Sequence, residues 1–251
     1  MSHRIYKNSI KENTSNSLFK YILRVCNFYS PKIFDKQTYP KTWTDPEFVS
    51  RMILLRKDKE KFSSVYDTVQ LSNELMKIPF ENNLQKIASN YSKINEKNLS
   101  IRVIQLRMDF PNDTRNSYNW HQDSAYDKFS LNSNNGVILW IPLIDTNKKN
   151  GTLVIKPGSE YSGFNCSKRV SKGDRFNSEQ ILVMPKYLKK YRSKHINLKK
   201  NNCLVTYSGI FHKSGINLSD HIRFTLIARY NNQLSKDFVF YRRSLNNKKF
   251  S

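Results

Sequence analysis

Cysteine, histidine and acidic residues are all scarce in this chain of 251 residues. Its three cysteines, Cys26, Cys166 and Cys203, show neither a C-x-x-C motif nor the paired spacing of a disulfide framework. This usage predicts free thiols, which persist in reducing compartments. We therefore expect a cytoplasmic protein without disulfide bonds.

Long apolar runs, internal repeats and extended linkers are also missing. The apolar stretch from Leu18 to Tyr29 is interrupted by Lys20 and Arg24, so it matches neither a signal peptide nor a membrane span. Its pattern predicts an amphipathic helix packed on the protein core, and attachment to a membrane surface is the less favoured alternative. The length suits one large β-rich domain, which we expect to be a monomer or a homodimer.

The shortage of acidic residues leaves 20 Asp and Glu against 43 Lys and Arg, a net charge of +23. Such a balance concentrates anions around a protein and is compatible with nucleic acid, anionic lipid or an acidic metabolite. The basic residues are spread along the chain and form no recognised nucleic-acid-binding motif, so a nucleic-acid partner is disfavoured. Abundant lysine and asparagine are also what an AT-rich genome produces. We expect a small-molecule partner, with an anionic compound as one candidate.

Helical patterns precede strand patterns along the chain. The sequence Thr44-Asp45-Pro46-Glu47 is a capping box with proline in the first turn, and short strands dominate from Ile101 onward. This order indicates an α+β, mainly β fold around a closed double sheet, a cupin-like double-stranded β-helix (jelly roll) with the N-terminal helices packed on the barrel. The predicted organisation is a disordered tail over 1–16 and one domain over 17–251, with helices at about 17–95 (among them 64–77 and 80–91), the jelly roll at about 100–241, and a lid or a solvated loop at 160–195.

Two of the five histidines stand in a pattern typical of a metal site. One residue separates His121 from Asp123, so on a strand their side chains point to the same side. His212 follows far downstream, after an apolar run at 136–143 that predicts a strand buried on both faces. Two imidazoles and one carboxylate on one face of Fe(II) leave coordination positions open for other ligands.

Five ordered blocks extend this pattern: WHQD, LWIPL, NGTLVIKPGS, HKSGIN and IRFTLIARY. Over about 101–231 they resemble the phytanoyl-CoA dioxygenase family of Fe(II)- and 2-oxoglutarate-dependent oxygenases. The resemblance implies an iron site made of His121, Asp123 and His212. It also implies that Arg223, eleven residues after the distal histidine, binds the distal carboxylate of 2-oxoglutarate with help from Ser214.

The resemblance further implies the reaction, in which O₂ oxidises an unactivated C–H bond of a small molecule while 2-oxoglutarate is decarboxylated to succinate and CO₂. A guanidinium suits the cosubstrate carboxylate because its planar fork of donors stays charged. The carboxylate of Asp123 favours hydroxylation, since halogenating relatives lack it; desaturation and epimerisation stay open. Further expected contacts are Gln105 for the cosubstrate, and Trp120, Arg107, Tyr126 and Asn217 for the substrate.

Three alternatives remain. Nucleic-acid demethylases of the same superfamily carry two arginines six residues apart on the last strand, a spacing that Arg223 and Arg229 show. A non-catalytic binding protein on the same jelly roll would have lost a metal ligand or the cosubstrate arginine, and neither is lost. A cupin isomerase or lyase would have more histidines near the first strand. Iron content with 2-oxoglutarate-dependent succinate formation separates an oxygenase from the last two.

Overall fold

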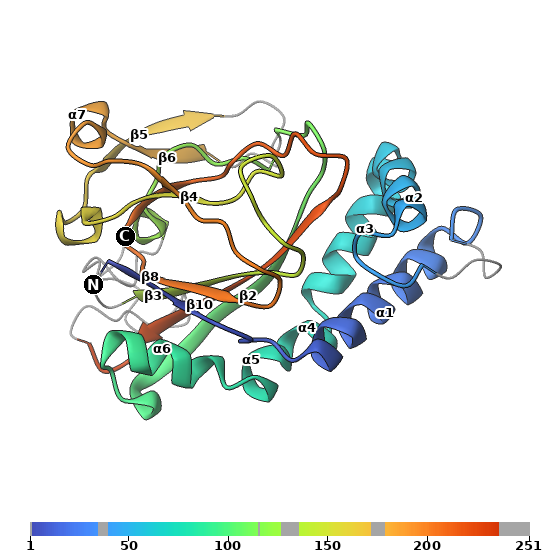
Figure 1. Cartoon of the computed structure of the whole chain (residues 1–251), viewed down its shortest axis with the longest axis horizontal. Coiled ribbons are helices and arrows are strands. Elements are labelled where there is room, and N and C mark those ends of the chain that lie inside the picture. Colours follow the sequence, from blue (N-terminus) through green and yellow to red (C-terminus); the bar gives the residue numbers. More distant parts are fainter. Residues whose placement is uncertain (1, 35–39, 115, 127–135, 172–178, 236–251) are drawn as a thin grey trace, which may run out of the picture.

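Residues 2–34, 40–114, 116–126, 136–171 and 179–235 are described by the computed structural model, with the backbone alone for 167–171 and 179. Figure 1 shows most of the helices beside and beneath a body of strands, with one short helix (Pro185–Leu188) at the upper left. The helices are α1 (Glu12–Tyr29), α2 (Pro46–Lys57), α3 (Lys59–Gln70), α4 (Asn73–Met76), α5 (Ile78–Glu81), α6 (Leu84–Ser92) and α7 (Pro185–Leu188). The strands are β1 (His3–Tyr6), β2 (Leu99–Asp109), β3 (Gly136–Pro142), β4 (Val154–Lys156), β5 (Cys166–Ser171), β6 (Glu179–Val183), β7 (Lys194–His195), β8 (Cys203–Tyr207), β9 (Phe211–Lys213) and β10 (Arg223–Asn232).

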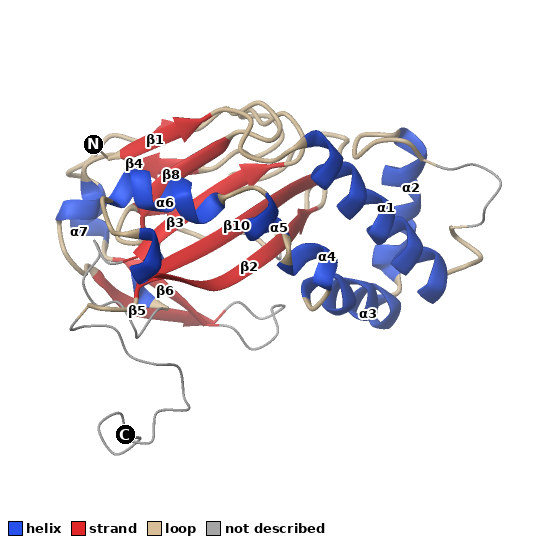
Figure 2. Cartoon of the chain, turned by 90° about the horizontal axis from the view of Figure 1, so that it is seen from below, coloured by secondary structure: helices blue, strands red, loops and turns tan. Residues whose placement is uncertain are grey.

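The strands pair in antiparallel sheets, in agreement with the mixed fold of helices and strands expected from the sequence. The largest sheet has the order β1-β8-β3-β10-β2, a second has the order β7-β4-β9, and β5 pairs with β6. In Figure 2, α5 and α6 lie across one face of the five-stranded sheet, while α1, α2 and α3 gather at one end. Strand β3 is buried at every position, which confirms the strand predicted from the apolar run at 136–143.

Alternation along the strands gives the five-stranded sheet two different faces. On the helix side, Leu106 and Met108 of β2 pack into the main apolar cluster. On the opposite side, Trp140 of β3 and Ile227 of β10 pack with Ile155 of β4 in a smaller cluster. The two larger sheets therefore lie face to face, and the polar side chains of β2 that alternate with its apolar ones point into the space between them.

The N-terminal segment differs from the prediction. A disordered tail over 1–16 is wrong for the described residues, because β1 pairs with β8 from His3↔Thr206 to Tyr6↔Cys203 and α1 begins at Glu12. An edge strand pairs with one neighbour and leaves its outer backbone groups to solvent, so a polar composition does not prevent its formation. The amphipathic helix predicted from Leu18 to Tyr29 is confirmed as the greater part of α1.

Local capping explains two smaller differences among the helices. Asp45, and not Thr44, caps α2, since its Oδ1 accepts the N–H of Glu47 at 3.0 Å and Pro46 opens the helix. The helix predicted at 64–77 is interrupted after α3, where the Ser72 hydroxyl accepts the N–H of Leu75 at 3.2 Å and begins α4. A serine bonded in this way favours a helix start over a helix interior.

The segment expected to be a lid, 160–195, contains β5, β6, α7 and β7. Its residues 172–178 lie outside the described part of the chain, so a lid there stays a prediction. Cys26, Cys166 and Cys203 are free and buried, as their spacing predicted. None of the helices in the described ranges combines the length and apolarity needed to cross a membrane.

Candidate metal centre

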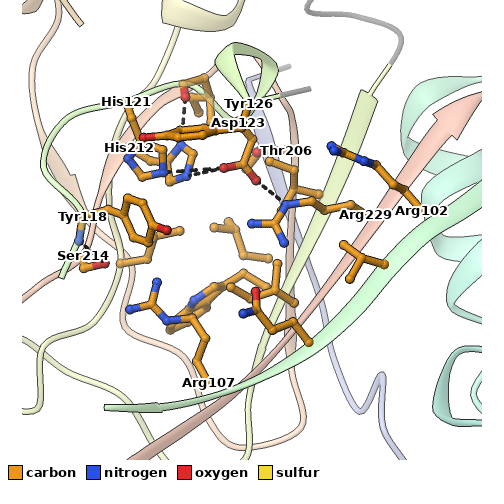
Figure 3. A pocket seen from close by; sticks show the side chains of 18 of the residues that line it. Arg102, Arg107, Tyr118, His121, Asp123, Tyr126, Thr206, His212, Ser214 and Arg229 are labelled. Carbon is orange, nitrogen blue, oxygen red and sulfur yellow. Dashed lines mark hydrogen bonds and ion pairs between the residues drawn. The ribbon is translucent and has the colours of Figure 1, made fainter. Parts of the chain in front are cut away.

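His121, Asp123 and His212 converge at one place between the two larger sheets (Figure 3). The two histidines form an isolated antiparallel bridge, with backbone N–H···O distances of 3.0 and 3.1 Å. Asp123 opens a short 3-10 turn instead of continuing a strand as expected. Its Oδ1 nevertheless lies 3.5 Å from Nε2 of each histidine. The three side chains are thus brought to one point by a backbone bridge and a turn.

The hydrogen bonds of both imidazoles leave the same nitrogen available. Nδ1 of His121 lies 2.7 Å from the carbonyl oxygen of Asn119, and Nδ1 of His212 lies 3.0 Å from that of Ile210. In a neutral imidazole, a ring nitrogen that faces a carbonyl carries the proton and Nε2 keeps the lone pair. Burial, together with the neighbouring His212, lowers the pKa of His121 to about 4. His121 is therefore neutral near pH 7, the form that binds a metal ion.

Asp123 is held as a carboxylate. Burial alone would raise its pKa, but the charge of Arg229 and the neighbouring imidazoles outweigh burial and hold the pKa well below its usual value. Its Oδ2 accepts Nε–H of Arg229 at 2.6 Å, which leaves Oδ1 facing the histidines. Two neutral imidazoles and one carboxylate on one side of a point are the donor set of non-haem Fe(II) sites. The residues present fit Fe(II).

Gln122 lies between His121 and Asp123 in the sequence, and its side chain anchors this segment on the side away from the metal position. Its side chain is fully buried. Nε2 donates to the carbonyl oxygens of Gly163 and Gly209 at 2.9 and 2.8 Å, and Oε1 accepts the N–H of Asn165 at 2.8 Å. These bonds use the amide group away from the metal side, so the orientation of the adjacent ligands is set by buried polar contacts.

The three predicted ligands line a cavity of about 820 Å³. Ile138, Ile210 and Ile227 contribute apolar wall, and arginines contribute most of its charge. Five of the residues expected around the metal also line it: Gln105, Arg107, Tyr126, Ser214 and Arg223. Since the open side of the three ligands faces this cavity, small molecules in it would reach the metal position.

Arg223 lies in a buried charge network at one end of the cavity. Its Nη2 is 2.8 Å from Oδ2 of Asp109, whose Oδ1 is 2.7 Å from Nη2 of Arg107. Burial raises the pKa of Asp109, but the two guanidiniums outweigh it and hold the pKa below its usual value. Nε of Arg223 is buried and has no hydrogen-bond partner among the described residues. An unpartnered donor of this kind fits an anionic ligand at this end.

The loop that carries Ser214 reaches the same region through a close backbone contact. A Cβ on Gly215 would lie 2.5 Å from the carbonyl oxygen of Thr152, and one on Gly151 would lie 2.6 Å from that of Gly215. Only glycine permits this approach. Ser214 Oγ accepts the N–H of Tyr118 at 3.2 Å. Its own hydroxyl hydrogen is then left for a ligand in the cavity.

Two of the residues predicted to contact the substrate, Trp120 and Asn217, do not line the cavity. Trp120 lies between two lysines, with Nζ of Lys156 and Lys213 at 5.0 and 5.1 Å from its ring centre. It precedes His121 directly, and successive side chains in extended backbone point to opposite sides. Asn217 is a loop residue, and its Nδ2 donates to the carbonyl oxygen of Asp109 at 2.9 Å.

The described part of the expected lid lies behind the metal segment and contributes no lining residue. The N–H of Val183 donates to the carbonyl oxygen of Trp120 at 2.9 Å, and the N–H of Ile181 donates to the Tyr126 hydroxyl at 2.8 Å. Gln180 bonds to the same segment, since its Oε1 accepts the N–H of Asn119 at 3.2 Å. Strand β6 therefore supports the predicted ligands from outside the cavity.

Sequence reasoning missed three residues of the site. Arg229 entered only as the second arginine of a demethylase-like pair, and Asp109 and Tyr118 did not enter. The even offset between Arg223 and Arg229 was the available signal, since it places both on the cavity face of β10. The ring centres of Tyr118 and His121 lie 5.0 Å apart. No spacing in the sequence predicts this contact.

Solved structures with this fold include two non-heme alpha ketoglutarate dependent enzymes from nogalamycin biosynthesis. SnoK, a non-heme alpha ketoglutarate dependent carbocyclase from nogalamycin biosynthesis, is 12% identical, with a TM-score of 0.61 over 92% of this chain and 80% of its own. The epimerase SnoN in complex with Fe³⁺, alpha ketoglutarate and nogalamycin RO is 12% identical, with a TM-score of 0.57 over 92% and 79%. EvdO2 from Micromonospora carbonacea var. aurantiaca is 21% identical, with a TM-score of 0.51, and the match spans 63% of this chain but only 62% of EvdO2.

At these identities the solved structures establish the fold alone, and no curated protein matches the chain significantly. The sequence profile of the phytanoyl-CoA dioxygenase (PhyH) family, in contrast, matches residues 42–225, which include the three predicted ligands and Arg223. That span is most of the chain. The protein belongs to the phytanoyl-CoA dioxygenase family, whose cofactors are Fe(II), 2-oxoglutarate and O₂.

Proposed function

We propose that this protein is an Fe(II)- and 2-oxoglutarate-dependent dioxygenase that hydroxylates an unactivated C–H bond of a small molecule, releasing succinate and CO₂. One observation carries the proposal. Two imidazoles and a carboxylate, with ligand atoms within 4.8 Å of one another, open onto a cavity that ends in the buried Arg223. A metal position and a carboxylate-binding position in one cavity are what the two cofactors need.

The two larger sheets, in this proposal, are the halves of a double-stranded β-helix, and they form one oxygenase domain with the helices. Its N-terminal boundary lies before β1, so the domain includes the segment expected to be a tail. Buried free cysteines favour a reducing compartment, and we place the protein in the cytoplasm as a monomer or a homodimer.

His121, Asp123 and His212 would hold the iron. Fe(II), with 2-oxoglutarate and O₂, supplies the oxidising power for attack on a C–H bond. The backbone carbonyls at both Nδ1 atoms fix the tautomers, so both Nε2 atoms point at one position. Ligands held this rigidly need little rearrangement when the ion binds.

Arg223 and Ser214 would bind the distal carboxylate of 2-oxoglutarate. The unpartnered Nε of Arg223 and the free hydroxyl hydrogen of Ser214 are donors of the kind that a carboxylate accepts. Gln105, Arg107 and Tyr126 line the rest of the cavity. Charge-assisted hydrogen bonds contribute about 1.5–3 kcal/mol each, so Arg223 and Ser214 would orient the cosubstrate.

The substrate would occupy the remaining volume, whose walls combine isoleucine side chains with arginine. The carboxylate of Asp123 favours hydroxylation among the reactions open to the family. SnoN and SnoK act as an epimerase and a carbocyclase on their own substrates, so analysis of the product is part of the test.

The test is a metabolite panel incubated with the iron-loaded protein, scored for substrate-stimulated release of CO₂ from 2-oxoglutarate. We expect at least one compound to stimulate release and to yield a product heavier by one oxygen. His121→Ala should abolish the stimulation. His195→Ala is the matched control, since His195 is an exposed histidine of β7. Methylated oligonucleotides belong in the panel, because stimulation by them alone would favour the demethylase. No stimulated release from any compound, with iron bound, would contradict an enzymatic role.

A further inference from the structure

Arg229 has two sets of donors, and only one of them is used. Its Nε donates to Oδ2 of Asp123 at 2.6 Å, and the side chain is 23% exposed. An arginine guanidinium presents five N–H donors in a planar fork. The structure gives Arg229 no other hydrogen bond or ion pair among the described residues. Its Nη1 and Nη2 therefore remain available on the cavity side, since Arg229 lines the cavity.

The position of Arg229 separates it from the end of the cavity that holds Arg223. Both lie on β10, six residues apart, which is roughly 20 Å of backbone at about 3.3 Å per residue. Figure 3 shows Arg229 with Arg102 and Thr206 on one side of the predicted ligands, and Ser214 with Arg107 on the other. The two arginines of β10 thus serve different ends of one cavity.

Arginines outnumber carboxylates in the described lining of the cavity. Its described lining contains four arginines and a single carboxylate, that of Asp123, with no glutamate and no lysine. Arg107 and Arg223 share Asp109, which lies behind the lining. An iron dication and a 2-oxoglutarate dianion cancel each other. Among the described residues, arginine charge around the cavity therefore exceeds carboxylate charge even with both cofactors bound, which favours an anionic substrate.

Resting on the function proposed above, we propose that Arg229 binds an anionic oxygen group of the substrate, a carboxylate or a phosphate, through its Nη1 and Nη2 donors. A planar fork matches two oxygens of such a group. Because the guanidinium of Arg229 also bonds to the carboxylate of Asp123, the anionic group of the substrate would lie beside the metal position. The oxidised carbon is then close to the anionic group of the substrate.

The experiment measures binding and needs no turnover. Protein loaded anaerobically with Fe(II) and 2-oxoglutarate is titrated by calorimetry with inorganic phosphate and with two matched pairs: octanoate against octanamide, and glucose 6-phosphate against glucose. Arg229→Lys is the test variant. The lysine ammonium keeps a positive charge beside Asp123 but lacks the planar fork of N–H donors that a guanidinium offers to a second anion. Arg24→Lys, an exposed change on α1, is the control.

We expect phosphate or an anionic member to bind, and its neutral partner to bind about tenfold more weakly or not at all. At saturating Fe(II), Arg229→Lys should raise the dissociation constant of the anion by about tenfold or more and leave that of 2-oxoglutarate within about twofold. The control should bind like the wild type. Equal dissociation constants for the anionic and neutral partners would overturn the proposal. So would the absence of any anion with a dissociation constant below about 10 mM. A loss of 2-oxoglutarate binding in Arg229→Lys as large as the loss of anion binding would also overturn it. Failure to bind Fe(II) or 2-oxoglutarate at all would instead contradict the proposed function.

Discussion

Replacing Asp109 by asparagine should destabilise the free protein and increase the stabilisation that 2-oxoglutarate provides. Asp109 bridges Arg107 and Arg223 at 2.7 and 2.8 Å, and the side chains of all three are at most 15% exposed. Asparagine keeps the shape but removes the charge. Breaking a buried ion pair from one side costs about 3–5 kcal/mol. For a chain of this size, that lowers the melting temperature by on the order of 10 °C.

The added stabilisation by 2-oxoglutarate follows from the same charges. With Asp109 present, a carboxylate of the cosubstrate must share Arg223 with a protein carboxylate. In Asp109→Asn the cosubstrate becomes the main counter-charge for Arg223, so it should bind about tenfold more tightly, the equivalent of about one charge-assisted hydrogen bond.

Thermal unfolding with fixed anaerobic Fe(II) and increasing 2-oxoglutarate measures both effects. Asp145→Asn is the matched control, because its ion pair with Lys199 is exposed (53% and 81%) and such pairs contribute about 0–1 kcal/mol. Equal melting temperatures for the two variants would refute the buried network. A rise in melting temperature with 2-oxoglutarate no larger in Asp109→Asn than in the wild type would refute the competition for Arg223.

Three further predictions concern the metal and its neighbours. Asp123→Ala should lower Fe(II) affinity by about a hundredfold or more in a competition titration with a chelating dye, since a primary ligand contributes at least as much as an outer-shell partner. Arg223→Ala should weaken 2-oxoglutarate by about 10- to 100-fold in calorimetry with little change in Fe(II) affinity. The metal-free protein should lose up to about 3 kcal/mol of stability in denaturant titrations as the pH falls from about 6.5 to about 4, because the pKa of His121 is lowered to about 4 and only the unfolded state takes up the proton in this range. A flat profile there would contradict a buried neutral His121.

Much of the candidate site was predictable because its signals are local or lie in short ordered blocks. One residue separates His121 from Asp123, and the loop with Ser214 follows His212 directly. The strand pattern around Arg223 placed it on the same face as Ile227, and both line the cavity. Fold class followed from the change between helical and strand periodicity. Each of these features is set by spacing within one element.

The remaining features depend on which strands become neighbours. Asp109 meets Arg223 because β2 and β10 pair with these residues opposite each other, a register that local patterns do not contain. Strand β1 forms only because β8 offers it an edge. Trp120 was expected in the cavity, but the side on which a residue points is set by the bridge between His121 and His212. Long-range pairing, and not residue type, decides these outcomes.

The central claim is tested most directly by anaerobic titration of the metal-free protein with Fe(II) and then with 2-oxoglutarate, followed by visible absorption. The account predicts one Fe(II) per chain and a charge-transfer band that appears only when 2-oxoglutarate is added. His121→Ala should lose both, and His195→Ala should keep both. Tight Fe(II) binding retained in His121→Ala, or a wild-type protein whose spectrum does not respond to 2-oxoglutarate, would contradict it.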